Sequence, residues 1–126
     1  MATTAGEQTV HRLLAAYQRL DVDGMVECFT QAGAYHAMSM ESAVGKDALH
    51  KLWSEWANTM SGVICEVHRQ LCDETVVMHG RTDRSTAGGR ELMTPVAAVF
   101  DIDNGLITNW REYFDDPRTP YTAPQR

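Results

Sequence analysis

Three side chains in the second half of the sequence have the chemistry for acid–base catalysis: Arg81, Asp83 and Glu112. Side chains alternate across a β-strand, so Arg81 and Asp83, two residues apart, point to the same face of a strand. A guanidinium that holds two carboxylates can keep one ionised as a base while the other is protonated and acts as an acid. Spacing alone favours a plain salt-bridge triad, because charged pairs on neighbouring strands are common. Catalysis is the alternative.

Glu112 lies in a predicted strand, where the alternation of side chains puts it on the same face as apolar residues. One face of that segment holds Thr108, Trp110, Glu112 and Phe114. The two aromatic residues indicate that this face is buried by helices, and a carboxylate there is costly unless it has a partner. Arg81 is the natural partner. We therefore expect Arg81, Asp83 and Glu112 to meet on one concave surface.

Helical spacing of apolar residues is typical of the first sixty residues. It predicts a helix over residues 8–20. Asp21 or Asp23 can cap a short second helix, residues 34–40 are predicted to form a short strand, and a third helix opens with Asp47 as its cap. The second helix is predicted to contain Met25, Val26 and Phe29, and the third to turn inward Leu49, Leu52, Trp53, Trp56 and Met60.

After residue 62 the pattern changes to the alternation of β-strands. Strands are predicted from residue 63 onward and over 76–85, 92–102 and 107–114. Gly88-Gly89 marks one hairpin and Asp103-Asn104-Gly105 a second, because these residues suit tight turns. Helices followed by a series of strands predict an α+β domain with the helices packed on one face of an antiparallel sheet.

Length and charge limit the possible functions. The chain has 126 residues, which suits one domain, with an ordered core over about 7–115 and an irregular, proline-containing tail over 116–126. A net charge of −6 with 11 scattered basic residues argues against a nucleic-acid partner. No apolar run is long enough for a membrane span, and the first residues lack the pattern of a secretion signal.

The cysteines and histidines favour no metal, cofactor or disulfide. Three cysteines without C-x-x-C spacing fit free thiols in a reducing cytoplasm, so we expect a cytoplasmic protein. The histidines lack the paired spacing of metal ligands, so no metal site is expected. These histidines are His11, His36, His50 and His68.

Two segments resemble the limonene-1,2-epoxide hydrolase family: Gly80-Arg81-Thr82-Asp83 and the run from Gly105 to Asp115. The family belongs to a group of cone-shaped folds shared with nuclear transport factor 2, ketosteroid isomerases and SnoaL-type cyclases. The resemblance covers roughly residues 13–115. It implies a curved, mixed but mainly antiparallel sheet that forms a cone, with about three helices closing a deep pocket. We also expect a homodimer through the outer face of the sheet.

The resemblance implies a role for each polar residue. Asp83 would be the general acid that protonates an epoxide oxygen, and Arg81 the bridge between the carboxyl groups. Glu112 would be the base that deprotonates the attacking water, and Tyr35 would bind that water. The reaction would be hydrolysis of a small apolar or terpenoid-like epoxide by one-step acid–base catalysis, without a covalent enzyme intermediate. No cofactor is implied.

Two positions depart from the family pattern. Glu112 stands where the family has an aspartate, and Ala37 stands where it has an asparagine that binds water. His79, on the same strand face as Arg81, can supply the missing ligand or a base, or is a core histidine bonded to a neighbour. The pocket shape is expected to depend on Tyr17, Met38, Leu52, Trp53, Val96 and Trp110, with Tyr17 either a packed wall or a proton donor.

Other activities of the same fold group remain alternatives. Ketosteroid isomerase chemistry is disfavoured, because its two carboxyl groups would fall near His36 or Ala37 and near Ala97, where this chain has none. A SnoaL-like cyclase or isomerase stays open, including opening of an epoxide by the substrate's own hydroxyl group. A noncatalytic binder of polyketide-like or terpenoid-like molecules is the third possibility.

Overall fold

The computed structural model describes residues 3–38 and 40–114. Within them, three α-helices accompany a six-stranded sheet of strand order β2-β1-β6-β5-β4-β3. Neighbouring strands are antiparallel except β1 and β6, which are parallel. The elements are α1 (Ala5–Gln18), α2 (Val22–Val26), β1 (Phe29–Ala37), β2 (Ala43–Val44), α3 (Lys46–Thr59), β3 (Gly62–Cys72), β4 (Val76–Ala87), β5 (Arg90–Asp103) and β6 (Leu106–Phe114). The predicted α+β class is confirmed.

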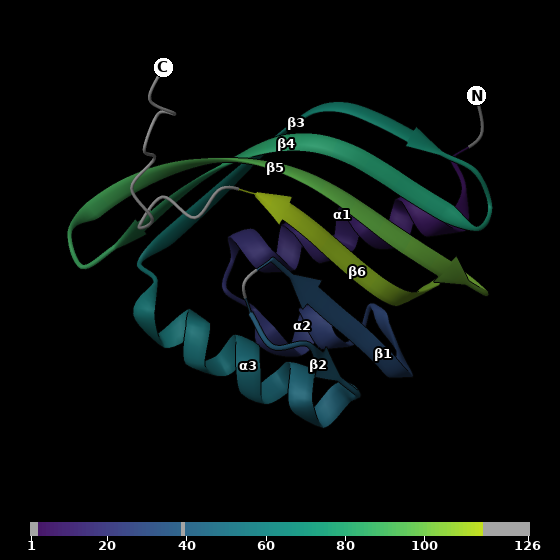
Figure 1. The fold of residues 1–126 in the computed structure, drawn as a ribbon, viewed down its shortest axis with the longest axis horizontal. Coiled ribbons are helices and arrows are strands. Elements are labelled where there is room, and N and C mark those ends of the chain that lie inside the picture. Colours follow the sequence, from purple (N-terminus) through teal and green to yellow (C-terminus); the bar gives the residue numbers. More distant parts are fainter. Residues whose placement is uncertain (1–2, 39, 115–126) are drawn as a thin grey trace, which may run out of the picture.

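The sheet is curved, and the helices lie on its concave side (Figure 1). The long strands β3, β4 and β5 arch over α1, while α3 lies next to β1 and α2 contacts both α1 and α3. Each helix turns apolar residues toward the sheet, so one core forms between the two layers. The fully buried members of this core are Val10, Leu13, Met25, Phe29, Leu49, Val77, Phe100 and Ile107.

The first helix begins earlier than its apolar pattern predicts. It was expected over residues 8–20 and is observed over Ala5–Gln18. The Thr4 side chain accepts a hydrogen bond from the backbone N–H of Glu7 at 3.0 Å, which is an N-cap that satisfies an otherwise free donor. The helix ends before Leu20, whose φ of 58° is not helical.

Two expectations about the following helices are wrong. Asp21 caps α2 as predicted, with its Oδ1 accepting from Gly24 N at 3.0 Å, but Phe29 is the first residue of β1 rather than part of that helix. Asp47 is not the cap of α3, because Gly45 holds that position without a side-chain hydrogen bond. The chain enters α3 directly from β2, and its φ of 92° at this position suits glycine.

Both predicted hairpins are confirmed. Gly88 and Gly89 join Ala87 to its partner Arg90, and both glycines have positive φ. Asn104 and Gly105 join Asp103 to Leu106 in the same way, with φ of 51° and 76°. Two-residue turns of this kind match the twist of the strands they connect, which fixes the register of β5 against β4 and β6.

Some expectations fall on residues outside the described ranges. The predicted irregular tail over 116–126 lies outside the described residues, as does residue 39 of the predicted strand over 34–40. None of the helices in the described ranges is long and apolar enough to cross a membrane. The three cysteines, Cys28, Cys65 and Cys72, are all free thiols.

Candidate active site

Arg81 is the centre of a buried polar cluster on the concave face of the sheet. Its side chain is completely buried, and its guanidinium forms ion pairs with the carboxylates of Asp83 and Glu112, as predicted. Nε donates to Asp83 Oδ1 at 2.8 Å and Nη2 donates to Asp83 Oδ2 at 3.0 Å. Nη2 also donates to Glu112 Oε2. The structure therefore brings Arg81, Asp83 and Glu112 into direct contact.

The strand register explains how residues of β4 and β6 meet across β5. Ala98 of β5 pairs with His79 of β4 on one side and with Glu112 of β6 on the other. Its side chain is a single methyl group, buried on the concave face. We infer that this small residue leaves room above β5, so that the long Arg81 side chain can reach Glu112.

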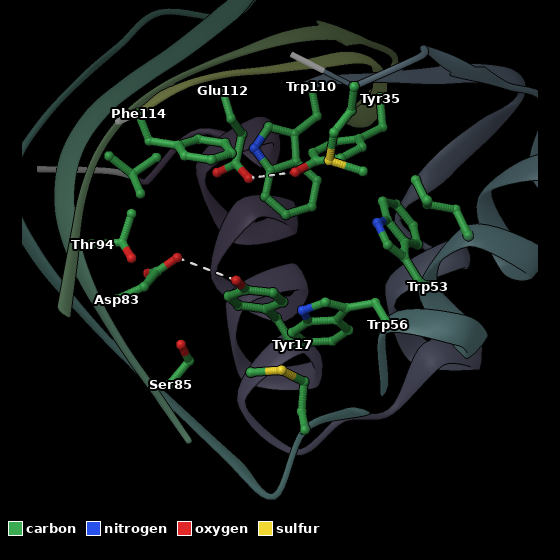
Figure 2. A pocket seen from close by; sticks show the side chains of 14 residues that line it. Tyr17, Tyr35, Trp53, Trp56, Asp83, Ser85, Thr94, Trp110, Glu112 and Phe114 are labelled. Carbon is green, nitrogen blue, oxygen red and sulfur yellow. Dashed lines mark hydrogen bonds between the residues drawn. The ribbon is translucent and has the colours of Figure 1, made fainter. Parts of the chain in front are cut away.

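Each carboxylate also has its own tyrosine. Tyr17, from α1, donates from its hydroxyl to Asp83 Oδ2 at 3.2 Å. Tyr35, from β1, donates to Glu112 Oε1 at 2.7 Å. Figure 2 shows the two pairs on different sides of one pocket, with each tyrosine hydroxyl directed at its carboxylate. The site is thus a single arginine between two carboxylate–tyrosine pairs.

Burial and charge set the protonation behaviour of this cluster. Burial raises the pKa of Glu112 above its usual value, although Arg81 and the Tyr35 hydroxyl oppose the shift. Burial works against the charge of Arg81, but Glu112 and Asp83 overcome it and raise the pKa of the guanidinium well above its usual value. Burial first, then the nearby carboxylates, raises the pKa of both tyrosines.

The raised pKa of Glu112 agrees with the net charge of the cluster. With both carboxylates ionised, one cation faces two anions in a buried place, which leaves an uncompensated negative charge. One added proton neutralises it. A cluster that holds one proton on two carboxyl groups has the composition of an acid–base pair.

The two carboxylates and their two tyrosines form part of the wall of a cavity of about 190 Å³. This volume is below the roughly 300–1,000 Å³ of pockets for drug-sized ligands, so it suits a small molecule. Most of the wall is aromatic or aliphatic, and the acidic and phenolic groups face the cavity as two separate pairs (Figure 2). The lining residues are Tyr17, Tyr35, Met40, Leu52, Trp53, Trp56, Met60, Asp83, Ser85, Thr94, Val96, Trp110, Glu112 and Phe114.

Most of the residues expected at the site line this cavity, whereas Arg81, Met38 and His79 do not. The expected residues that line it are Tyr17, Tyr35, Leu52, Trp53, Asp83, Val96, Trp110 and Glu112. Met38 lies after the end of β1, is 50% exposed and does not line the cavity, whereas Met40 does. His79 is buried beside Arg81 but outside the cavity wall.

Some lining residues were not predicted from the sequence. Ser85 follows Asp83 on the same face of β4, so alternation alone is a signal that could have found it. Thr94 pairs with Asp83 across β4 and β5, which only the strand register reveals. Ala37 pairs with Glu112 across β1 and β6, so the residue that replaces the family's amide is next to the predicted base.

The described residues offer no obvious metal site. Within residues 3–38 and 40–114, no three His, Cys, Asp or Glu side chains converge as metal ligands would. The two carboxylates nearest one another in the cavity wall are both bonded to the cation of Arg81.

Comparison with known proteins places these observations in a family. The model of the limonene-1,2-epoxide hydrolase catalytic domain matches residues 4–119. A stretch of 54 residues is 39% identical to the epoxide hydrolase EphG of Mycobacterium tuberculosis. That match covers 43% of this chain and 36% of EphG, so it spans about a third of the length of this relative.

Solved structures agree with the fold. A limonene-1,2-epoxide hydrolase-like enzyme from M. tuberculosis superposes with a TM-score of 0.79 at 27% identity, covering 88% of this chain and 83% of the other. An NTF2-like protein of unknown function from Burkholderia pseudomallei has a TM-score of 0.81 at 16% identity, with coverages of 90% and 92%. SalBIII, an epoxide hydrolase/cyclase-like enzyme in pyran ring formation, has a TM-score of 0.76 at 16% identity, with coverages of 86% of this chain and 89% of the other.

The last two likenesses concern the fold alone, which is the cone shared with NTF2-like proteins. The family model, in contrast, spans nearly the whole chain, including the segments that contain Arg81, Asp83 and Glu112. The chain therefore belongs to the limonene-1,2-epoxide hydrolase family.

Proposed function

We propose that this protein is an epoxide hydrolase that adds water to a small apolar or terpenoid-like epoxide in one acid–base step. The observation that carries the proposal is the buried guanidinium of Arg81, which holds Asp83 and Glu112 at the wall of a small apolar cavity. Such a cavity suits an apolar molecule, and the two carboxyl groups that line it supply a proton donor and a proton acceptor.

In the proposed reaction, Asp83 in its protonated form gives its proton to the epoxide oxygen as the carbon–oxygen bond breaks. Glu112 takes a proton from a water molecule whose oxygen attacks the ring carbon. The product is a diol, and one proton has moved from Asp83 to Glu112. Return of a proton to Asp83 resets the enzyme, with Arg81 bridging the two carboxyl groups throughout. The raised pKa of Glu112 makes it a stronger base.

Tyr35 can hold the attacking water despite the alanine at position 37. Its hydroxyl hydrogen is directed at Glu112 Oε1, so its oxygen keeps lone pairs that can accept a hydrogen bond. A water molecule that gives one hydrogen to Glu112 can give the other to Tyr35. In this arrangement the Tyr35 phenol oxygen accepts the hydrogen bond from water that an amide oxygen at position 37 would accept, so Ala37 needs no polar role.

Tyr17, beside Asp83, and Trp110, beside Tyr35, are proposed to bind the substrate from two sides of the cavity. Tyr17 contacts Asp83 through its hydroxyl and stacks on Trp56 with ring centroids 4.9 Å apart, so its ring position is fixed. The indole N–H of Trp110 is buried and finds no acceptor among the described residues. It is therefore a donor that a ligand oxygen in the cavity can use.

The test is turnover of limonene oxide and cyclohexene oxide in heavy-oxygen water. Labelled diol is expected, and Asp83→Asn and Glu112→Gln should each lower its rate by about a hundredfold to ten-thousandfold, because each removes one half of the acid–base pair. Circular dichroism of both variants shows whether they remain folded. Absence of diol from a panel of small epoxides would sink the proposal.

Ring closure is the second candidate, favoured by Ala37 beside Glu112. A substrate hydroxyl group held by its own carbon chain needs no amide to position it, and Glu112 can deprotonate it as it would water. A hydroxy-epoxide then gives a cyclic ether without label from heavy-oxygen water. A noncatalytic binder would instead bind both kinds of epoxide, unchanged, in a calorimetric titration.

We further propose that the protein is a cytoplasmic homodimer that pairs through the convex face of the sheet. Large apolar side chains on that face are 48% to 76% exposed: Ile64, Leu71, Met78, Met93 and Tyr113. Covering them removes apolar surface from water. Light scattering should report a dimer that Met78→Glu converts to a monomer. Val44→Glu, on β2 at the opposite edge of the sheet, should leave it dimeric. Cell fractionation checks the location.

A further inference from the structure

His79 lies next to Arg81, outside the wall of the cavity, and is joined to it by a hydrogen bond. Arg81 Nη1 and His79 Nε2 are 3.1 Å apart, and the imidazole ring is 5% exposed. His79 does not line the cavity, so it cannot touch a substrate there. Any effect it has on the reaction must therefore pass through the guanidinium.

The hydrogen bonds continue from His79 to the surface of the protein. His79 Nδ1 is 3.1 Å from Gln70 Oε1 on β3, and Gln70 Nε2 donates to Glu7 Oε2 on α1 at 3.1 Å. The thiol of Cys72 donates to the same Glu7 oxygen at 3.1 Å. We call Glu7, Gln70, His79 and Arg81 the polar chain.

The two ends of the polar chain determine which nitrogen of His79 holds the hydrogen. Arg81 can only donate, so His79 Nε2 must be a bare acceptor. At the other end an ionised Glu7 can only accept, so the Gln70 amide nitrogen faces Glu7 and its oxygen faces His79. His79 Nδ1 must then hold the hydrogen. The chain is satisfied only by the neutral Nδ1–H tautomer.

We propose that His79 is a positioning residue, which as the neutral Nδ1–H tautomer orients the Arg81 guanidinium toward Asp83 and Glu112. The other nitrogens of Arg81 are engaged by the two carboxylates. Without an acceptor for Nη1, the buried guanidinium would have to turn or leave a donor unsatisfied. His79 thus accepts from the one guanidinium nitrogen that donates to neither carboxylate.

The charges around His79 agree with a neutral ring. Arg81 and Asp83 on β4 and His11 on α1 act on it, and the ring also packs edge to face against Phe100 of β5. Burial, and then the positive charge of Arg81, lower the pKa of His79 to about 4, although Asp83 opposes the shift. With this lowered pKa the ring is neutral at pH 7, and a neutral ring keeps a bare Nε2 that can accept from the Arg81 guanidinium.

This inference deepens the proposed function, and its kinetic test depends on that function. His79→Leu should lower kcat on the order of tenfold to a hundredfold, the scale of one lost hydrogen bond to a charged group. KM should stay within about twofold, because the residue does not contact the cavity. His79→Gln should recover most of kcat, since its amide oxygen can accept from Arg81. His68→Leu, an exposed histidine on β3, is the matched control and should leave kcat unchanged.

A spectroscopic test is independent of turnover. In nitrogen-15 spectra of the ligand-free protein at pH 7, His79 should be the neutral Nδ1–H tautomer, with the other four histidines as references. Separate signals are expected for the Arg81 Nη hydrogens, because their hydrogen bonds hinder rotation. These signals should broaden in His79→Leu and persist in His79→Gln.

The outcomes separate the two proposals. An Nε2–H or protonated His79 at pH 7 overturns the positioning role, and so do unchanged Arg81 signals and full kcat in His79→Leu. If His79→Leu does not fold, the tautomer in the unmodified protein still decides. If the protein opens no epoxide, the hydrolase proposal fails, while the His79 and Arg81 spectra continue to test the positioning role.

Discussion

At the scale of single residues, the site depends on how many hydrogen bonds each carboxylate receives. Glu112 accepts from Arg81 and from Tyr35, and burial acts against its charge. Asp83 accepts from Arg81 twice and from Tyr17. Each carboxylate thus accepts from Arg81 and from one tyrosine, so loss of the Tyr35 hydroxyl should change the protonation of Glu112.

Removal of the Tyr35 hydroxyl tests this dependence. Its hydrogen bond lowers the pKa of Glu112, so Tyr35→Phe should raise that pKa further. The base must be ionised to act, and the acidic limb of the pH profile of kcat/KM should therefore move to higher pH. We also expect kcat to fall about tenfold to a hundredfold, since a hydrogen bond to a charged group is lost.

The control for this variant is Tyr113→Phe, which removes a hydroxyl from an exposed tyrosine on the convex face of the same strand. It should change neither the rate nor the pH profile. An acidic limb that stays in place, or moves to lower pH, in Tyr35→Phe would contradict the assignment of Glu112 as the base.

At the scale of secondary structure elements, β4, β5 and β6 position the site through their register. The hairpin at Asn104-Gly105 sets where β6 begins to pair with β5, and a register shift between Asp101 and Ile102 then sets where Trp110 and Glu112 lie relative to Arg81. Gly105 has a φ of 76°, and a Cβ built there would lie 3.2 Å from the Cβ of Ala5 on α1. The turn therefore needs glycine for its conformation and for its close contact with the helix.

Gly105→Ala should lower the free energy of unfolding by about 1–2 kcal/mol, because alanine is strained at positive φ and crowds Ala5. Urea denaturation measures the change. Gly62→Ala is the matched control, since Gly62 has no atom within 4 Å of a built Cβ and no positive φ. Its unfolding free energy should be unchanged or slightly higher. Equal losses in the two variants would contradict this account of the turn.

At the scale of the whole molecule, buried ionisable groups link stability to pH. The pKa of His79 falls from the usual 6.5 to about 4 on folding. Between these values the unfolded chain binds a proton that the folded protein does not, so the contribution of His79 is complete above pH 6.5 and is lost as the pH falls toward 4. The shift corresponds to about 3 kcal/mol. The raised pKa of Glu112 acts with the opposite sign, since its contribution is lost as the pH rises.

The difference between the protein and His79→Gln isolates the part due to His79. Urea denaturation from pH 7.5 to pH 4 should show the unmodified protein losing up to about 3 kcal/mol more stability than the variant, because glutamine does not titrate. Glu112 contributes to both curves and cancels to a first approximation. Parallel curves would mean that His79 is not a buried neutral base.

The sequence alone determined the features that follow from local chemistry. Alternation placed Arg81 and Asp83 on one strand face, and glycine and asparagine marked both hairpins, because these depend only on neighbours in the chain. The pairing of Glu112 with Arg81 was also expected, because a buried carboxylate is costly without a cationic partner. The confirmed α+β class followed from the order of helical and strand patterns.

Only the tertiary structure decided what depends on register and on bulges. Strand β3 has an irregularity between Val67 and Arg69, which reverses its alternation, so that Gln70 pairs with His79 and bonds to it on the concave side. No sequence pattern marks this extra residue, because a bulge is set by the twist that the whole sheet adopts. The sequence left His79 open between a ligand in the pocket and a core histidine bonded to a neighbour, and the structure places it outside the cavity wall, bonded to Arg81 and Gln70.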